Sequence, residues 1–227
     1  MTALVSALYA EGRSDERFLP VLLQRSMTDW LGSHSSRIVD VLEPLIVNPA
    51  RRGDRAERIL AAAKQVSGYH LLFVHADADD NTSQRAYTER IAPGVARISA
   101  ARTAGEAACA EVIPIIPVQM VETWLLADAD TLCNVIGAAP SPRQLEIPLR
   151  PDEIERITDP KQRLREIMQR AYASRPRRRR AVELGELYEP LANQIRLAEL
   201  ERLPSYQQYL SDLDSVLRRL HFVPENR

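Results

Sequence analysis

Acidic residues stand directly after apolar runs of the sequence, at positions where a buried strand would end. Glu11 follows "ALVSALYA", while Asp77, Asp79 and Asp80 follow "YHLLFVHA". Carboxylates that gather within a few ångströms repel one another unless a cation lies between them. Mg²⁺ binds through a few carboxylate oxygens together with water. These residues therefore predict a site for Mg²⁺, or for Mn²⁺ in its place.

Alternating strand and helix patterns are expected to position these side chains. Alternation and apolar runs predict strands over 3–10, 37–47, 70–76 and 110–120, the second bent or ended near Pro44. Helical spacing predicts helices over 14–31, 54–67 and 121–132. A polar loop is expected at 77–84, followed by a helical segment that ends at about residue 108. Strands that alternate with helices in this way are typical of a doubly wound α/β fold with a parallel sheet. Pro114 and Pro117 favour an edge position for the last strand.

The carboxyl ends of parallel strands meet at one edge of the sheet, where α/β proteins bind their ligands. Glu11, the aspartates at 77–80 and Glu122 all follow predicted strands, so they should reach that same edge. Asp77 and Asp79 are two residues apart, which places them on one side of an extended chain. Each acidic turn taken alone could instead cap a helix, since Asn81, Thr82 and Ser83 follow. Two acidic strand ends at matching positions favour the site.

Two other acidic motifs fit the loop after residue 76 poorly. An EF-hand reading of "DADDNTSQRAYT" has Thr82 where the loop requires Gly and Thr88 where it requires Glu. A phosphatase-type Asp-x-Asp nucleophile normally lies on the first strand, whereas this pair follows the third. We therefore reject the EF-hand and do not favour the phosphatase.

Length and composition bound the remaining possibilities. The 227 residues suffice for one sizeable core, and the net charge of −1 restricts any nucleic-acid binding to a local patch. Two cysteines cannot build a disulfide framework or a cysteine-based zinc site. No apolar run approaches a membrane span, which predicts a cytoplasmic protein without a membrane partner. The change of texture near Gly137 predicts a catalytic domain over 1–137 and a helical extension over 138–227 that packs on it.

The order and spacing of these motifs resemble the Toprim domain of topoisomerases, primases, recombination proteins and OLD-family nucleases. The match comprises "EGRSD" at residues 11–15 and, after one strand–helix unit, "DAD" at residues 77–79. The string "PVQMVETWLLAD" at 117–128 is further similar to small stand-alone Toprim-like proteins of unassigned function, often encoded beside ATPases in phage-defence loci. The resemblance covers most of the chain and is clearest over 4–130.

This resemblance implies a Rossmann-like parallel sheet with helices on both faces and Mg²⁺ held by Asp77 and Asp79. It implies that Glu11 acts as general acid or base, or as a further ligand, and that Asp80 and Glu122 could complete a second site. The chain lacks room for the tyrosine domain of a topoisomerase and the cysteines for a primase zinc module. A nuclease working with an ATPase partner in defence is then the leading hypothesis. A non-catalytic nucleic-acid-binding or sensor subunit and a phosphotransferase acting on nucleotides remain alternatives.

Basic residues could supply the contact with nucleic acid. Residues 161–180 hold nine Lys or Arg against a single Glu, which would neutralise phosphates. An Arg-rich chain also places such runs on solvated helix faces, and both interpretations stay open. The candidate contacts are Arg51, Arg52, Lys161, Arg177 and Arg178. Trp124 is expected in the core.

Overall fold

The computed structural model describes residues 2–50, 52–173 and 182–224. Its centre is a four-stranded parallel sheet with the strand order β4-β2-β5-β6, and β1 pairs in parallel with β3 beside it. The strands are β1 Thr2–Leu4, β2 Ser6–Tyr9, β3 Val39–Val41, β4 Leu45–Ile46, β5 Leu71–His75 and β6 Val112–Ile115. The expected α/β class with a Rossmann-like parallel sheet is confirmed.

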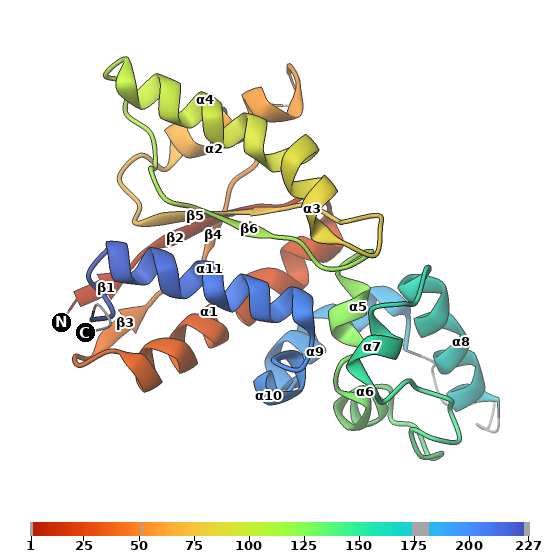
Figure 1. Cartoon of the computed structure of the whole chain (residues 1–227). Helices are drawn as coiled ribbons and strands as arrows, with labels where there is room; N and C mark the ends of the chain where they lie inside the picture. Colours follow the sequence, from red (N-terminus) through yellow and green to blue (C-terminus); the bar gives the residue numbers. More distant parts are fainter. Residues whose placement is uncertain (1, 51, 174–181, 225–227) are drawn as a thin grey trace.

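Helices cover both faces of the sheet (Figure 1): α2 and α4 lie on one face, and α1 and α11 on the other. The helices are α1 Arg13–His34, α2 Arg55–Gln65, α3 Ser83–Ala86, the π-helix η1 Tyr87–Ile91, α4 Ala92–Thr103, α5 Glu122–Leu125, α6 Ala129–Ile136, α7 Pro151–Ile154, α8 Pro160–Tyr172, the 3₁₀-helix η2 Leu184–Glu186, α9 Tyr188–Gln194, α10 Leu197–Leu200 and α11 Pro204–Arg219.

Alternate residues of the central strands face two separate hydrophobic cores. Leu71 and Phe73 of β5 join the core that contains α1 and α11, while Leu72 and Val74 join the core that contains α2 and α4. Both sets are fully buried, because every second side chain of a strand points to the opposite face. The near-continuous apolar run of this strand follows from its position inside a doubly covered sheet.

Several predicted elements are shorter or divided. The strand expected over 3–10 is interrupted at Val5, whose N–H donates to His70 Nδ1 at 3.1 Å, and the strand over 37–47 is interrupted before Pro44. The single helix expected over 121–132 is wrong. It divides into α5 and α6, because Asp128 caps α6 by accepting a hydrogen bond from the Thr131 N–H at 3.1 Å.

The strand expected over 110–120 is restricted to β6, at the edge of the sheet, as its prolines predicted. The carbonyl groups of Glu111 and Ile115 accept hydrogen bonds from β5 and its extension. Backbone groups of alternate residues in a strand point to opposite neighbours, and the residues that bond to β5 are odd-numbered, so the backbone of Pro114 faces away from β5. Helix α11 contacts this strand.

The C-terminal third shares a core with the sheet. Trp124 is buried, as expected, and its ring packs edge-on against Tyr206 of α11 with centroids 5.2 Å apart. The larger hydrophobic core contains residues from both sides of residue 137, among them Phe73 and Leu213. The boundary between 1–137 and 138–227 stays a prediction. Within the described residues, no helix is long and apolar enough to cross a membrane.

Candidate functional site

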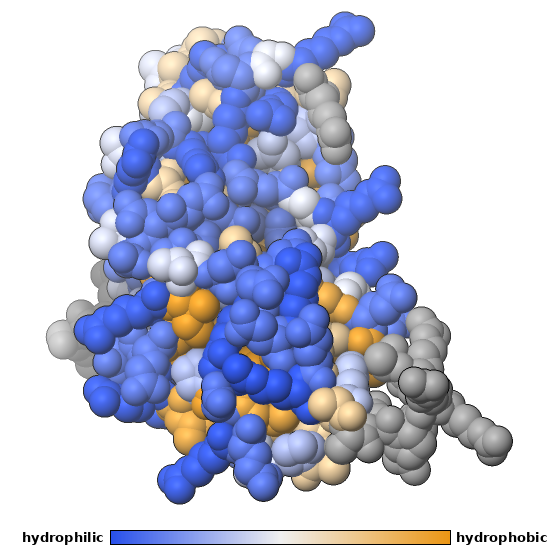
Figure 2. Space-filling view, turned by 90° about the vertical axis from the view of Figure 1, so that its right-hand side faces the viewer, coloured by the Kyte–Doolittle hydropathy of each residue, from blue (hydrophilic) through white to orange (hydrophobic). Residues whose placement is uncertain are grey.

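The candidate site lies at the carboxyl ends of β2, β5 and β6. The strands run from left to right in Figure 1, so these ends face the viewer of Figure 2. Hydrophilic side chains cover most of that surface, and hydrophobic ones appear mainly in its lower half, at the height of α6 to α8 (Figure 2). Glu11 and Asp77 lie in the loops after β2 and β5, and Glu122 is the first residue of α5, which follows β6.

His75, the last residue of β5, lies between two carboxylates. Its Nδ1 is 3.4 Å from Asp15 Oδ2, and its Nε2 is 3.4 Å from Asp77 Oδ1. The ring is fully buried, and both contacts fall short of hydrogen-bond geometry. Burial opposes protonation of the imidazole, but Asp77 and Asp15 outweigh it, so the pKa of His75 is raised. The two acids therefore favour protonation of the imidazole, against the effect of its burial.

Asp15 lies in the first turn of α1, where its Oδ2 accepts a hydrogen bond from the Gly12 N–H at 2.9 Å. The side chain is 8% exposed. Burial raises the pKa of Asp15 to about 6, and the nearby charges of Asp77 and Glu122 act in the same direction. His75 and the Gly12 N–H oppose that rise. Asp15 can consequently gain or lose a proton near neutral pH.

Glu11 is joined to the end of β5 by Arg55. Its Oε2 accepts a hydrogen bond from the Asp77 N–H at 3.4 Å, and its Oε1 forms an ion pair with Arg55. Arg55 also donates to the carbonyl of His75 at 2.6 Å and to that of Arg90 at 3.0 Å. The first residue of α2 thus connects the ends of two strands with the π-helix η1.

Asp79 does not continue an extended chain from Asp77, so the backbone geometry on which the expectation of two side chains on one side depends is absent. Its φ of +50° places it in the left-handed region, which residues other than glycine adopt uncommonly. Its N–H donates to the Gln119 carbonyl at 3.0 Å, and Gln119 also has a positive φ of +60°. The carboxylate pairs with Arg90 at 2.5 Å, and Arg90 donates to the Asp77 carbonyl at 2.9 Å.

Glu122 is buried at the start of α5 and contacts two distant parts of the chain. The Tyr188 hydroxyl donates a hydrogen bond to its Oε1 at 2.5 Å, and Lys161 Nζ is 3.6 Å from the same oxygen. Burial raises the pKa of Tyr188, and the negative charge of Glu122 raises it further. Lys161, a candidate contact for nucleic acid, therefore lies beside the candidate carboxylate of Glu122.

The other predicted residues are less closely tied to this group. Asp80 is exposed, and its Oδ1 accepts a hydrogen bond from the next N–H of its own loop at 2.6 Å. Arg52 is exposed in the segment before α2. Arg51, Arg177 and Arg178 lie outside the described residues.

Sequence reasoning did not select five residues that complete this group: Asp15, His75, Arg55, Arg90 and Tyr188. The sequence held a signal for two of them. Asp15 belongs to the "EGRSD" motif but was given no role in the site, and His75 is a titratable residue at the end of an apolar strand, two residues before Asp77. The two arginines and the tyrosine reach the site from α2, η1 and α9, and sequence spacing does not reveal such contacts.

The carboxylate oxygens of the group are suitable ligands for a hard divalent cation. Their present arrangement does not yet form a metal site. Asp77 Oδ1 is buried against His75 without a formal hydrogen bond, but the side chain as a whole is 27% exposed, so part of its carboxylate can meet a ligand. The pKa of Asp15 is raised first by burial and then by the charges of Asp77 and Glu122, and a cation bound near these carboxylates would offset that repulsion. However, the described residues contain no group of three or more His, Cys, Asp or Glu side chains arranged to hold a metal. Glu11 Oε1 and Asp79 would have to leave Arg55 and Arg90 to act as ligands.

A comparison with known families and proteins gives a single finding. The model of the DUF4276 family, described as a domain of unknown function, matches residues 10–214 of the chain. No curated protein and no solved structure matches the chain.

Proposed function

The chain belongs to the DUF4276 family, and we propose that it is a Mg²⁺-dependent nuclease that hydrolyses phosphodiester bonds of nucleic acid. One observation supports this most directly. The carboxylates of Glu11, Asp15, Asp77 and Glu122 act electrostatically on one another or on His75 at the carboxyl ends of three parallel strands. Ligand sites of α/β proteins occupy that position, and groups with perturbed pKa values cluster at functional sites.

The residues divide into those that would hold the ion and those that position them. Asp77 offers its partly exposed carboxylate, and Glu11 lies against the Asp77 backbone. His75 positions Asp77 from behind, and Asp15 on the other side of the ring supports His75 in turn. When bound, Mg²⁺ would polarise the phosphodiester and lower the pKa of an attacking water.

Proton transfer and charge stabilisation can be assigned to further residues of the group. The pKa of about 6 suits Asp15 for exchanging a proton near neutral pH, as general acid–base catalysis requires. Glu11 is the proposed proton shuttle at the exposed side of the site. Lys161, 42% exposed next to Glu122, could contact a phosphate. The proposed nucleic-acid contacts also include Arg51, Arg52, Arg177 and Arg178, and binding should weaken with salt.

The proposal includes a cellular setting. We propose that the protein acts in the cytoplasm, and, from the sequence resemblance, that it acts in phage defence with an ATPase as its partner. The geometry of the site neither requires nor opposes that partner, so activity is to be measured with and without it.

The test uses purified protein with end-labelled DNA and with tRNA, in Mg²⁺, in Mn²⁺ and in EDTA. We expect cleavage that depends on the divalent ion and is abolished by Asp77→Ala. Glu106→Gln removes a carboxylate far from the site, which pairs with Lys64, and should leave the rate unchanged. Cleavage that persists in EDTA or in Asp77→Ala would refute the proposal.

A non-catalytic nucleic-acid-binding or sensor subunit is the second candidate, and the ion pairs at the site favour it. Arg55 and Arg90 already neutralise Glu11 and Asp79, as a site without a metal would require. Under this alternative, calorimetry would detect no Mg²⁺ or Mn²⁺ binding, while labelled nucleic acid would bind without being cleaved. Divalent-ion binding that Asp77→Ala removes would instead exclude it.

A further inference from the structure

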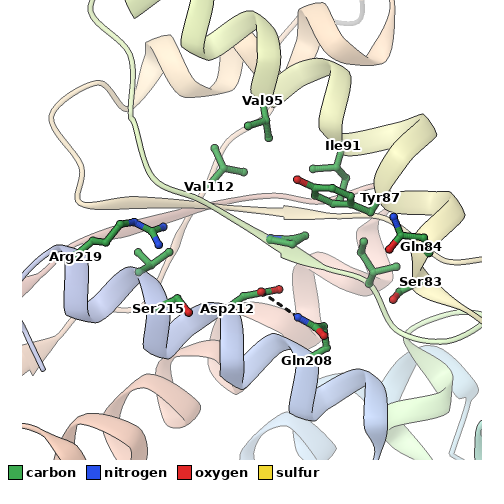
Figure 3. Close-up of a pocket in the computed structure, with 13 residues that line it drawn as sticks. Ser83, Gln84, Tyr87, Ile91, Val95, Val112, Gln208, Asp212, Ser215 and Arg219 are labelled. Atoms are coloured by element: carbon green, nitrogen blue, oxygen red, sulfur yellow. Dashed lines mark hydrogen bonds between the residues drawn. The ribbon is translucent and has the colours of Figure 1, made fainter. Parts of the chain in front are cut away.

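A groove of about 370 Å³ lies beside the edge strand of the sheet, outside the group of residues proposed for hydrolysis. Its floor is β6, and its two walls are η1 with α4 on one side and α11 on the other (Figure 3). Cavities of roughly 300–1,000 Å³ hold small organic ligands in proteins. The groove is therefore large enough for a ligand with one or two rings.

One wall of the groove is apolar. The ring of Tyr87 lies along it beside Ile91 and Val95, and Val112 of the strand continues the surface below them (Figure 3). Tyr87 is 37% exposed, one of the few large apolar side chains to be so accessible. An exposed aromatic face above an apolar floor favours a flat, apolar ligand body.

The opposite wall is polar and carries a carboxylate without a counter-charge. Asp212 accepts a single hydrogen bond, from Gln208 Nε2 at 3.1 Å, and has no cationic partner among the described residues. Arg219, at the other end of the groove, is paired with Glu111 at 2.6 Å. Burial raises the pKa of Asp212. A half-buried carboxylate in this position would gain from a positively charged ligand group.

We propose that this groove binds a small organic cation with a flat aromatic body. The ammonium group would pair with Asp212, and the ring would pack against Tyr87. An anionic ligand of the same shape would meet the Asp212 charge and be excluded. The site differs from the proposed nuclease centre in its residues and its ligand, so the proposal stands or fails independently of that function.

The test uses calorimetry of the full chain with tryptamine and with tryptophol, which replaces the ammonium by a hydroxyl. Tryptamine should bind with a dissociation constant on the order of 1 mM or tighter, as expected for a ligand of this size. Because tryptophol lacks the charged hydrogen bond to Asp212, it should bind about ten- to hundredfold more weakly. Asp212→Asn should weaken tryptamine binding by the same factor and leave tryptophol unchanged.

Two further variants locate the binding and control for general charge effects. Asp40→Asn removes an exposed carboxylate that does not line the groove, and it should bind tryptamine as the wild type does. Ser215→Trp fills the groove while leaving Asp212 in place, and it should abolish binding of both compounds, provided circular dichroism confirms the fold. Equal affinity for tryptamine and tryptophol, undiminished binding to Ser215→Trp, or no saturation up to about 10 mM would each overturn the proposal.

Discussion

Replacing Asp15 by Asn should stabilise the protein at neutral pH. The buried carboxylate is held against its own preference, because burial and the charges of Asp77 and Glu122 raise its pKa to about 6. Asparagine has the same shape and keeps an oxygen for the Gly12 N–H, but it carries no charge. The substitution therefore removes a cost that the folded protein bears whenever Asp15 is ionised.

The magnitude follows from the pKa. A rise from 3.8 to about 6 corresponds to about 3 kcal/mol, at about 1.4 kcal/mol for each pH unit. This shift already includes the attraction between Asp15 and His75, so we expect a gain of about 3 kcal/mol at pH 7.5. The unfolding entropy of a chain of this length is roughly 0.5 kcal/mol per kelvin, so Tm should rise by about 6 °C.

The sign of the pH dependence provides a second test. Between pH 3.8 and about 6, the folded wild type holds a proton on Asp15 that the unfolded chain has released. The contribution of Asp15 to stability is therefore greatest below pH 3.8 and is lost as the pH rises through about 6. The advantage of the Asp15→Asn variant should be full at pH 7.5 and absent at about pH 4.

Urea unfolding of the wild type and both variants at the two pH values measures this effect, with Glu16→Gln as the control. Glu16 lies in the same helical turn and is not buried, so its loss should destabilise α1 by about 0.3–1 kcal/mol through the helix dipole. The two substitutions thus have opposite expected signs. Destabilisation by Asp15→Asn at pH 7.5, or a gain that persists at pH 4, would refute the electrostatic reasoning.

Two paired substitutions test the packing around the site. Asp128→Asn should lower the free energy of unfolding by about 2–4 kcal/mol, because the buried carboxylate of Asp128 accepts hydrogen bonds from Thr131 and Arg196. The control, Asp130→Asn, changes an exposed carboxylate and should lower it by less than about 0.5 kcal/mol. Gly94→Ala should lower the free energy of unfolding by about 1–3 kcal/mol, because the new Cβ would lie 2.7 Å from a buried side chain of α2. Gly32→Ala should raise it by about 0.5–1 kcal/mol, because no atom lies within 4 Å of the new Cβ. Chemical denaturation measures both pairs, and equal effects within either pair would contradict the assigned contacts.

The sequence predicted the fold class and the edge at which polar residues gather, because both follow from local patterns. The apolar run before Asp77 has strand length and the segment after Asp54 has helical spacing, and each pattern is specified within about ten residues. The interruptions at Val5 and within residues 121–132 could not be predicted in this way. They depend on one hydrogen bond from a backbone group to a distant or capping side chain, and such a bond leaves no periodic signal.

The internal arrangement of the candidate site could not be predicted in the same way. Tyr188 lies 66 residues from Glu122, and Arg55 lies 44 residues from Glu11, so these contacts exist only after the chain has folded. The conformation of Asp79 was missed for a different reason. Its positive φ is stabilised by hydrogen bonds with the loop around Gln119, and the usual preference of aspartate does not indicate it.

The position of Pro114 limits how this protein can associate. Its backbone faces outward from the last strand and offers no N–H, and α11 lies against the same strand. An incoming extended segment would find an incomplete hydrogen-bond ladder at this edge. Lengthening of the sheet by another chain is therefore favoured at the opposite margin, where Leu45 and Ile46 of β4 are exposed.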